Sequence, residues 1–176
     1  IEDINTFSHL VNSLSDLNSI FTEISKYFYH KFGITGTWLF LTKEKREYLY
    51  AYKAYSYNKL PADKYEYLMN KKIPMQENEG GMTYKTFQRK KPFYLSKIPK
   101  FEYEIDSEMV KKLSFTSFLQ VPLVRKEECV GVFSFSNFDK EMKLSKKEIS
   151  MIANLCSQIA GTVDTIHLLQ QVEVAK

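Results

Sequence analysis

The strongest constraint on the fold lies in residues 117–137, which read S-F-L-Q-V-P-L-V-R-K-E-E-C-V-G-V-F-S-F-S-N. Two apolar, strand-like runs flank a charged tip from Arg125 to Glu128, which predicts a β-hairpin. The first run contains Pro122 and the second contains Gly131. Proline belongs at a strand edge or a bulge because it has no N–H donor. A glycine in a strand lets another backbone or a bound group come close.

The composition indicates one folded domain with a full core. The chain has 176 residues, of which 44% are hydrophobic and 15% are aromatic, whereas a disordered chain would contain far fewer apolar residues. The net charge of +4 is small. The basic residues fall mostly in scattered pairs, which are typical of a solvated surface. We therefore expect no binding of nucleic acid.

The sequence predicts no membrane contact for this segment. No apolar run approaches the roughly 18 residues that a membrane-spanning helix needs, and the start shows no signal-peptide pattern. The chain begins without methionine, so we expect it to belong to a longer protein. Its two cysteines, Cys129 and Cys156, match neither a disulfide framework nor a metal-ligand spacing. We expect both to be buried as small apolar groups, in a cytoplasmic protein.

The spacing of apolar residues predicts a long amphipathic helix at each end of the chain. The first helix covers residues 1–32, with Gly33 as its C-terminal cap. The second covers residues 145–176 and begins with a capping box between Ser145 and Glu148. Each stripe either covers the domain's own sheet or packs against a second copy in a dimer. For the last turns, residues 163–174, we favour dimer packing, because we expect the sheet to be too short to reach them. The residues expected in the dimer helices are Phe7, Leu10, Leu14, Leu17, Ile159, Val163 and Ile166.

Strand patterns precede and follow three short helices. Residues 37–42 and 48–55 read as an antiparallel hairpin, in which Tyr48, Tyr50 and Tyr52 share one face. That face is either an ordinary sheet surface or the wall of a ligand pocket. We expect further helices at 61–69, at 82–89 and ending near residue 113, and short extended pieces at 72–75 and 93–96. The result is an α+β fold with an antiparallel sheet of five or six strands.

No catalytic or metal site is expected. A nucleophilic enzyme needs a base beside its Ser or Cys, yet His9, His30 and His167 all lie on the predicted terminal helices. The acidic residues from Glu102 to Glu108 complement a helix dipole and have no histidine among them. The pair Gly80-Gly81 before a helix could hold an anion on free N–H groups, but a loop-to-helix transition explains it equally well.

Taken together, three segments resemble a GAF domain, the sensor module of cyclic-nucleotide phosphodiesterases, bacterial cyclases, histidine kinases and phytochromes. Residues 81–96 resemble the family's glycine, short helix, Lys-Pro and strand. Residues 117–123 (S-F-L-Q-V-P-L) are close to its S-x-L-x-V-P-L strand, and residues 130–137 to its x-G-V-L-x-L partner strand. The resemblance implies a single GAF-like domain over residues 1–176.

The resemblance also implies a ligand pocket. In this family the ligand sits between the sheet and the short helices and loops on one face. The residues that the resemblance assigns to this pocket are Tyr50, Tyr52, Thr83, Tyr94, Ser117, Gln120 and Ser134.

The nature of the ligand stays open at this point. Family members that bind cyclic nucleotides carry an N-K…F-x-x-x-D-E signature near the closing helix. Here Asn137 is followed by Phe138, Leu144 replaces the phenylalanine, and Glu148-Ile149 replaces Asp-Glu, so the match is partial. A cyclic nucleotide and other small metabolites are both candidates. The chain lacks the pocket cysteines of the bilin-binding and methionine-sulfoxide-reducing relatives, and no cofactor is predicted with certainty.

The function implied by the resemblance is that of a regulatory sensor domain in a larger bacterial signalling protein. A small molecule would bind the domain, and the terminal helices would pass the signal through a homodimer to a linked output domain. A nucleotide cyclase or a histidine kinase is the output domain that family habit suggests. The alternative is a ligand-free module of the same fold, used for dimerisation or protein interaction.

Overall fold

The protein is described here by a computed structural model of residues 17–42 and 47–175, with the backbone alone for residues 166–168 and 170–175. The predicted stripe residues Phe7, Leu10 and Leu14 lie outside the described residues, and so does the side chain of Ile166. No helix among the described residues is long and apolar enough to cross a membrane.

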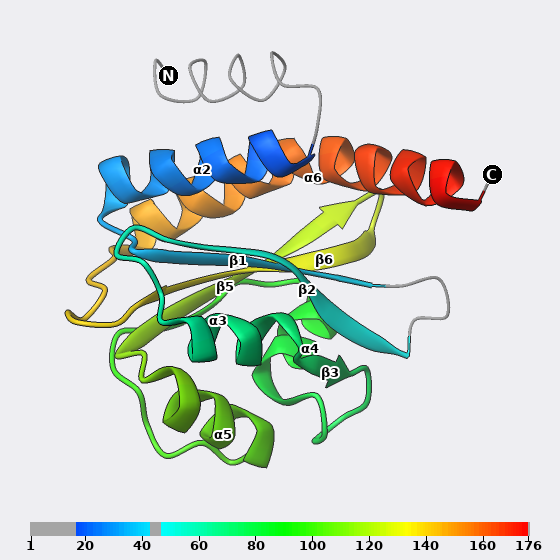
Figure 1. Ribbon diagram of the computed structural model, residues 1–176. Coiled ribbons are helices and arrows are strands. Elements are labelled where there is room, and N and C mark those ends of the chain that lie inside the picture. The colour runs from blue at the N-terminus through cyan, green and yellow to red at the C-terminus, as the bar shows by residue number, and fades with distance from the viewer. Residues whose placement is uncertain (1–16, 43–46, 176) are drawn as a thin grey trace.

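Six strands form one antiparallel sheet in the order β3-β2-β1-β6-β5-β4 (Figure 1). This confirms the predicted α+β class. Neighbouring strands are consecutive in the chain, apart from β1 and β6, which join the two halves of the sequence at the centre of the sheet. The strands are β1 (Gly36–Thr42), β2 (Tyr48–Ser56), β3 (Lys72–Pro74), β4 (Phe93–Leu95), β5 (Ser117–Arg125) and β6 (Glu128–Asn137).

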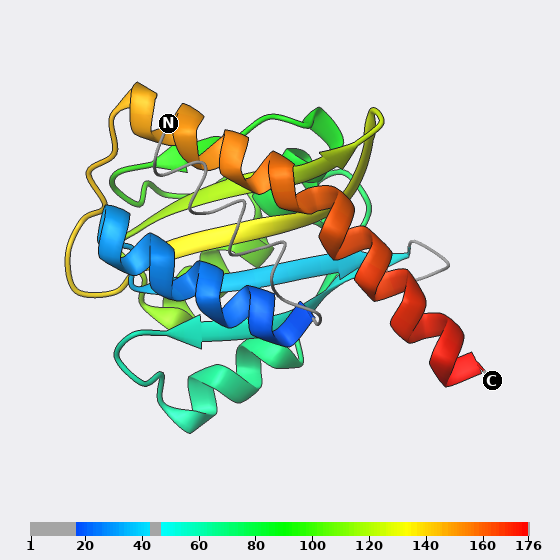
Figure 2. The same ribbon diagram turned by 90° about the horizontal axis from the view of Figure 1, so that it is seen from above.

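The helices form two separate layers on the sheet. The helices α2 (Leu17–Phe32) and α6 (Lys146–Ala175) lie side by side over one face, and α3 (Ala62–Met69), α4 (Gly81–Arg89) and α5 (Glu104–Leu113) cover the other (Figures 1 and 2). Each layer encloses its own hydrophobic core. The prediction of long terminal helices is confirmed in part, because α6 has 30 residues while α2 has 16.

The apolar stripes of the terminal helices belong to this chain's own core as far as Val163. Leu17, Ile159 and Val163 have no exposed surface and pack against the sheet residues of that core. We expected the sheet to be too short to reach Val163, and this expectation is wrong. The side chains of these three residues therefore cover their own sheet, and α6 leaves the sheet only beyond Val163 (Figure 2).

The hairpin β5–β6 closes in a tighter turn than the sequence predicted. The last paired residues are Arg125 and Glu128, so only Lys126 and Glu127 form the tip. Their φ angles are 50° and 67°, as a two-residue type I′ turn requires. Asn-Gly is the usual sequence for such a turn, and its absence explains why the sequence suggested a longer loop.

The unusual residues of the hairpin have the roles that their chemistry predicts. Strand β4 pairs with β5 only as far as Gln120, so Pro122 has no β4 residue opposite it. The pairing of β5 with β6 is irregular just after Pro122, between Leu123 and Val124. A Cβ atom at Gly131 would lie 2.5 Å from the carbonyl oxygen of Phe40. The glycine therefore lets the backbones of β1 and β6 approach at the centre of the sheet.

The predicted capping box of the last helix is present. The Ser145 N–H donates to Glu148 Oε1 at 3.0 Å, and the Glu148 N–H donates to Ser145 Oγ at 3.1 Å. Two N–H groups that the first turn of α6 leaves free are thus satisfied. At the other end of the chain, Gly33 caps α2 with a φ of 70°, and its N–H donates to the Tyr29 carbonyl, as predicted.

Candidate functional site

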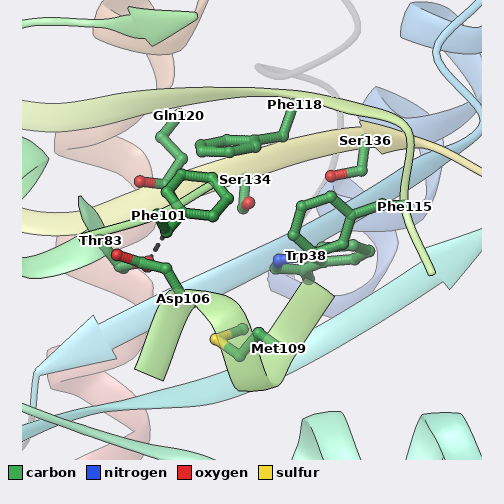
Figure 3. A pocket seen from close by; sticks show the side chains of 10 residues that line it. All are labelled: Trp38, Thr83, Phe101, Asp106, Met109, Phe115, Phe118, Gln120, Ser134 and Ser136. Atoms are coloured by element: carbon green, nitrogen blue, oxygen red, sulfur yellow. Dashed lines mark hydrogen bonds between the residues drawn. The ribbon is translucent and has the colours of Figure 1, made fainter. Parts of the chain in front are cut away.

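A small cavity lies between the sheet and the helices α4 and α5 (Figure 3). Three polar or aromatic residues form its floor in one row across the central strands, because Trp38 is paired with Ser134 and Ser134 with Gln120. The full lining consists of Trp38, Thr83, Phe101, Asp106, Met109, Phe115, Phe118, Gln120, Ser134 and Ser136.

Helix α4 is bound to the floor of the cavity by buried hydrogen bonds. The side-chain amide of Gln120 donates to Thr83 Oγ1 at 2.7 Å, and Thr86 Oγ1 donates to Gln120 Oε1 at 3.3 Å. All three residues are buried. A buried polar group without a partner is costly, so these bonds fix both the amide of Gln120 and the position of α4 over β5.

Asp106 lies on α5, and its carboxylate packs against the start of α4. Its two carboxylate oxygens accept the backbone N–H of Met82 at 3.2 and 3.0 Å. The residue belongs to the first turn of α5, so it lies near the N-termini of two helices, where negative charge is favourable. Gly81 allows this approach because a Cβ atom there would lie 2.7 and 2.8 Å from the carboxylate oxygens.

The carboxyl group of Asp106 is largely desolvated in this position. Only 7% of the residue is exposed, and burial raises the pKa of Asp106 to about 6, while the Met82 N–H acts in the opposite direction. The group is therefore mostly ionised at pH 7, although it has lost most of its water.

Ser136 is the unsatisfied member of the lining. Its Oγ is the one buried side-chain N or O atom of the described residues that has no hydrogen-bond partner. The residue has no exposed surface, and its hydroxyl lies along the cavity beside that of Ser134 (Figure 3). Leaving a buried hydroxyl unpaired costs about 1–3 kcal/mol, which a bound ligand or water at this place would recover.

Aromatic rings complete the wall. Phe118 lies on β5, with the rings of Phe101 and Phe115 at centroid distances of 5.8 and 5.6 Å. Trp38 faces them from β1, and its indole nitrogen points into the cavity (Figure 3). Apolar rings around a few convergent polar groups are typical of small-molecule sites.

The cavity is nearly closed in this structure. Its free volume is about 20 Å³, which is enough for one water molecule since a water needs about 10–15 Å³ of such space. Trp38 also lines a larger apolar groove of about 460 Å³ between β2 and α3. A ligand larger than water therefore needs one wall of the cavity to move.

Comparison with known proteins identifies the family. The family model of the GAF domain matches residues 16–163, which is most of the chain. The chain belongs to the GAF domain family. Members of this family are sensor and regulatory modules of signalling proteins, linked to output domains in larger chains. None of the curated proteins matches the chain.

Solved structures agree on the fold. The GAF domain of a phosphoenolpyruvate-protein phosphotransferase from Coxiella burnetii is similar with a TM-score of 0.76 and 13% identity, covering 97% of this chain and 95% of that one. The corresponding Acinetobacter domain has a TM-score of 0.71, 16% identity and coverages of 95% and 93%. The free methionine-R-sulfoxide reductase of Neisseria meningitidis, in complex with its substrate, has a TM-score of 0.72, 12% identity and coverages of 96% and 90%.

The structure of this GAF domain brings three of the seven predicted pocket residues together. Thr83, Gln120 and Ser134 line the cavity. The other four predicted residues, Tyr50, Tyr52, Tyr94 and Ser117, do not line it.

These four residues lie on the opposite face of the sheet because side chains alternate along a strand. Tyr50, Tyr52 and Tyr94 pack against the core under α2 and α6. Ser117 accepts the Met142 N–H at 2.6 Å, and the Tyr94 hydroxyl accepts the Leu144 N–H at 3.0 Å. Tyr94 and Ser117 therefore hold the segment that precedes α6.

Several lining residues were not predicted from the sequence. Trp38 shares a core with Leu49 and Ala51. These two residues alternate with the tyrosines of β2, so the sequence signal for the cavity face was the face of β2 that does not carry the tyrosines. Asp106 stood within a run of acidic residues, and nothing in the run distinguished it from Glu104 or Glu108. Only the packing of α5 against the start of α4 selects it.

Substitution of two glycines separates backbone strain from the contact with Asp106. Gly33 and Gly81 have φ angles of 70° and 60°, but a Cβ atom at Gly33 would meet nothing within 4 Å. Gly33→Ala should cost about 1–2 kcal/mol of unfolding free energy from the left-handed backbone alone. Gly81→Ala should cost clearly more, because its Cβ also meets the Asp106 carboxylate. Equal losses in urea denaturation would contradict this role of Gly81.

The raised pKa of Asp106 predicts a pH-dependent stability. Between about pH 4 and pH 6 the folded protein keeps a proton on Asp106 that the unfolded chain, with an ordinary pKa near 3.9, releases. The unfolding free energy contributed by this group therefore falls as the pH rises through that window, by about 3 kcal/mol at most. Asp106→Asn should gain stability relative to the unaltered protein from pH 4 to pH 7, as measured by urea denaturation.

A second carboxylate on the same helix provides the control. Glu108 lies two residues away on the outer face of α5, where it accepts hydrogen bonds from Tyr67 and Lys71. Glu108→Gln removes the same charge without touching the cavity. If both variants show the same trend with pH, the burial of Asp106 is not its cause.

Proposed function

We propose that this GAF domain is the small-molecule sensor of a larger signalling protein. The observation that carries the proposal is the enclosed lining in which Thr83, Gln120, Asp106 and Ser134 converge and the Ser136 hydroxyl has no partner among the described residues. Native proteins rarely leave a buried polar atom unpaired. A cavity that gathers such an atom with other polar groups and aromatic walls has the chemistry of a small-molecule site.

We infer that the domain itself is not an enzyme. The two cysteines are buried thiols outside the cavity lining, and burial raises the pKa of Cys156, which leaves its thiol unreactive at neutral pH. No histidine lies among the lining residues that the structure describes, so no described imidazole stands beside the hydroxyls of Ser134 and Ser136 as a base. The cavity is suited to binding.

The path of the signal runs along β5 to α6. Gln120 on the cavity floor and Arg125 at the end of β5 lie on this strand, and Arg125 forms an ion pair with Asp164 of α6 at 3.1 Å. The same guanidinium nitrogen also donates to Thr165 Oγ1 at 3.4 Å. Such a half-exposed pair adds little to stability, but it fixes α6 at the point where the helix leaves the sheet. A ligand that displaces β5 would therefore shift α6.

The projecting part of α6 would form a homodimer and transmit this shift to a linked output domain. The output domain that we propose is a nucleotide cyclase or a histidine kinase. Leu169, beyond the last core residue Val163, is 60% exposed. An exposed leucine on a helix that has left its own sheet suits contact with a second α6. We place the protein in the cytoplasm of a bacterium on the family resemblance.

The alternative is a ligand-free dimerisation module. In that module a single water could pair with the Ser136 hydroxyl, whereas the convergence of Thr83, Gln120 and Asp106 on one cavity favours the sensor. A cyclic nucleotide is one ligand to test among small metabolites, because part of its sequence signature is present.

Trp38 provides a direct test of binding. It is the one tryptophan of the chain and lies in the cavity wall, so a ligand there should change its fluorescence and raise the melting temperature. A panel of cyclic nucleotides, other nucleotides and small metabolites should contain at least one such compound. A panel without any effect on Trp38 would favour the ligand-free module.

Ser136→Ala distinguishes a binding residue from a packing residue. The variant should be as stable as the unaltered protein or more stable, because it removes an unpaired buried hydroxyl. It should bind the compound found in the panel about tenfold more weakly. Ser157→Ala is the matched control, since Ser157 donates to the Ala153 carbonyl on α6 far from the cavity. Equal binding by both variants would remove Ser136 from the site.

Leu169→Asp tests the dimer. If the end of α6 forms a parallel contact, this variant should shift the chain from dimer to monomer in analytical ultracentrifugation, while the melting temperature of the domain changes little. A chain that is monomeric without the substitution would contradict the dimer.

A further inference from the structure

The charge of the cavity lining restricts the class of ligand, an inference that rests on the proposed sensor function. Among the described lining residues there is one carboxylate, Asp106, and no lysine, arginine or histidine. Among the side chains that the structure describes, no cation forms an ion pair with Asp106. A desolvated carboxylate without a cation is costly. A bound cation would relieve this cost, and a bound anion would increase it.

One place that could bind an anion is already occupied. A glycine-rich turn at the start of a helix presents free N–H groups to a phosphate or carboxylate, and Gly80-Gly81 at the start of α4 has this form. The Met82 N–H at this turn is taken by Asp106. An anionic ligand would therefore have to compete with a carboxylate of the protein itself at the only charged part of the described lining.

The rest of the wall is suited to a cation. Trp38, Phe101, Phe115 and Phe118 line the same cavity as Asp106 (Figure 3). The faces of aromatic rings carry negative charge density and attract cations, tryptophan most strongly. The hydroxyls of Ser134 and Ser136 on the floor can form hydrogen bonds with other polar groups of the ligand, since a hydroxyl both donates and accepts.

We propose that the ligand carries a positively charged nitrogen, which lies against the rings of Trp38, Phe115 and Phe118 with Asp106 as its counter-ion. The present free volume of about 20 Å³ requires a wall to open for it. Phe101 and Phe115 are the wall rings that lie outside helices and strands, so they can turn aside without breaking backbone hydrogen bonds of the sheet.

Choline and 3,3-dimethyl-1-butanol test the role of charge on the unaltered chain, because the two probes have the same shape and only choline is cationic. Choline should change Trp38 fluorescence and raise the melting temperature, and the alcohol should bind at least tenfold more weakly. Equal binding of the two probes, or no effect of choline at tens of millimolar, would overturn the proposal. Stronger binding of cyclic AMP than of choline would also overturn it.

Asp106→Asn and Glu108→Gln test the counter-ion with variants of equal net charge. In Asp106→Asn the side-chain amide oxygen can still accept the Met82 N–H, so the fold should be kept. Asp106→Asn should weaken choline binding about tenfold or more and leave the alcohol unaffected, whereas Glu108→Gln should change neither. Equal losses in both variants would show a long-range effect of charge and overturn the assignment of Asp106.

The outcomes separate this proposal from the sensor function. If a neutral or anionic compound of the wider panel binds and Ser136→Ala weakens it while choline has no effect, the sensor function stands and the cationic ligand is wrong. If neither choline nor any compound of the panel changes Trp38 fluorescence, both are wrong.

Discussion

The alternation of side chains along the central strands is the constraint on which the rest of this structure depends. On β5 and β6, Leu119, Val121, Phe133 and Phe135 face the terminal helices, while their neighbours face the cavity. Burying each of these large apolar side chains contributes about 1.5–3 kcal/mol. Apolar side chains fill the face under the terminal helices. The polar residues that alternate with them, Gln120, Ser134 and Ser136, therefore lie together on the other face.

The same separation places structure and function on different layers. The unpaired Ser136 and the desolvated Asp106 each cost a few kcal/mol, which the filled core under α2 and α6 can offset. Arg125 is where the layers meet, because it continues the strand of Gln120 and contacts Asp164 of α6. A ligand in one layer can thereby act on the helix of the other.

The elements of the fold were largely predictable because their signals are local. The capping box of Ser145, the close approach at Gly131 and the two hairpins each follow from a few neighbouring residues. The face of the pocket was not predictable in this way. Strand alternation shows which residues share a face with Tyr50, Tyr52, Tyr94 and Ser117. It does not show which of the two faces of the sheet the long helices cover.

The sequence by itself determined the order of helices and strands, the antiparallel hairpins and the family, because periodicity, caps and turns depend on residues close together in the chain. Tertiary structure alone decided which face holds the cavity and which acidic residue enters it. Asp106 differs from Glu108 only in its contact with the start of α4, 24 residues earlier in the chain. It is this packing of two helices, invisible to any local pattern, that desolvates one carboxylate and leaves the other in water.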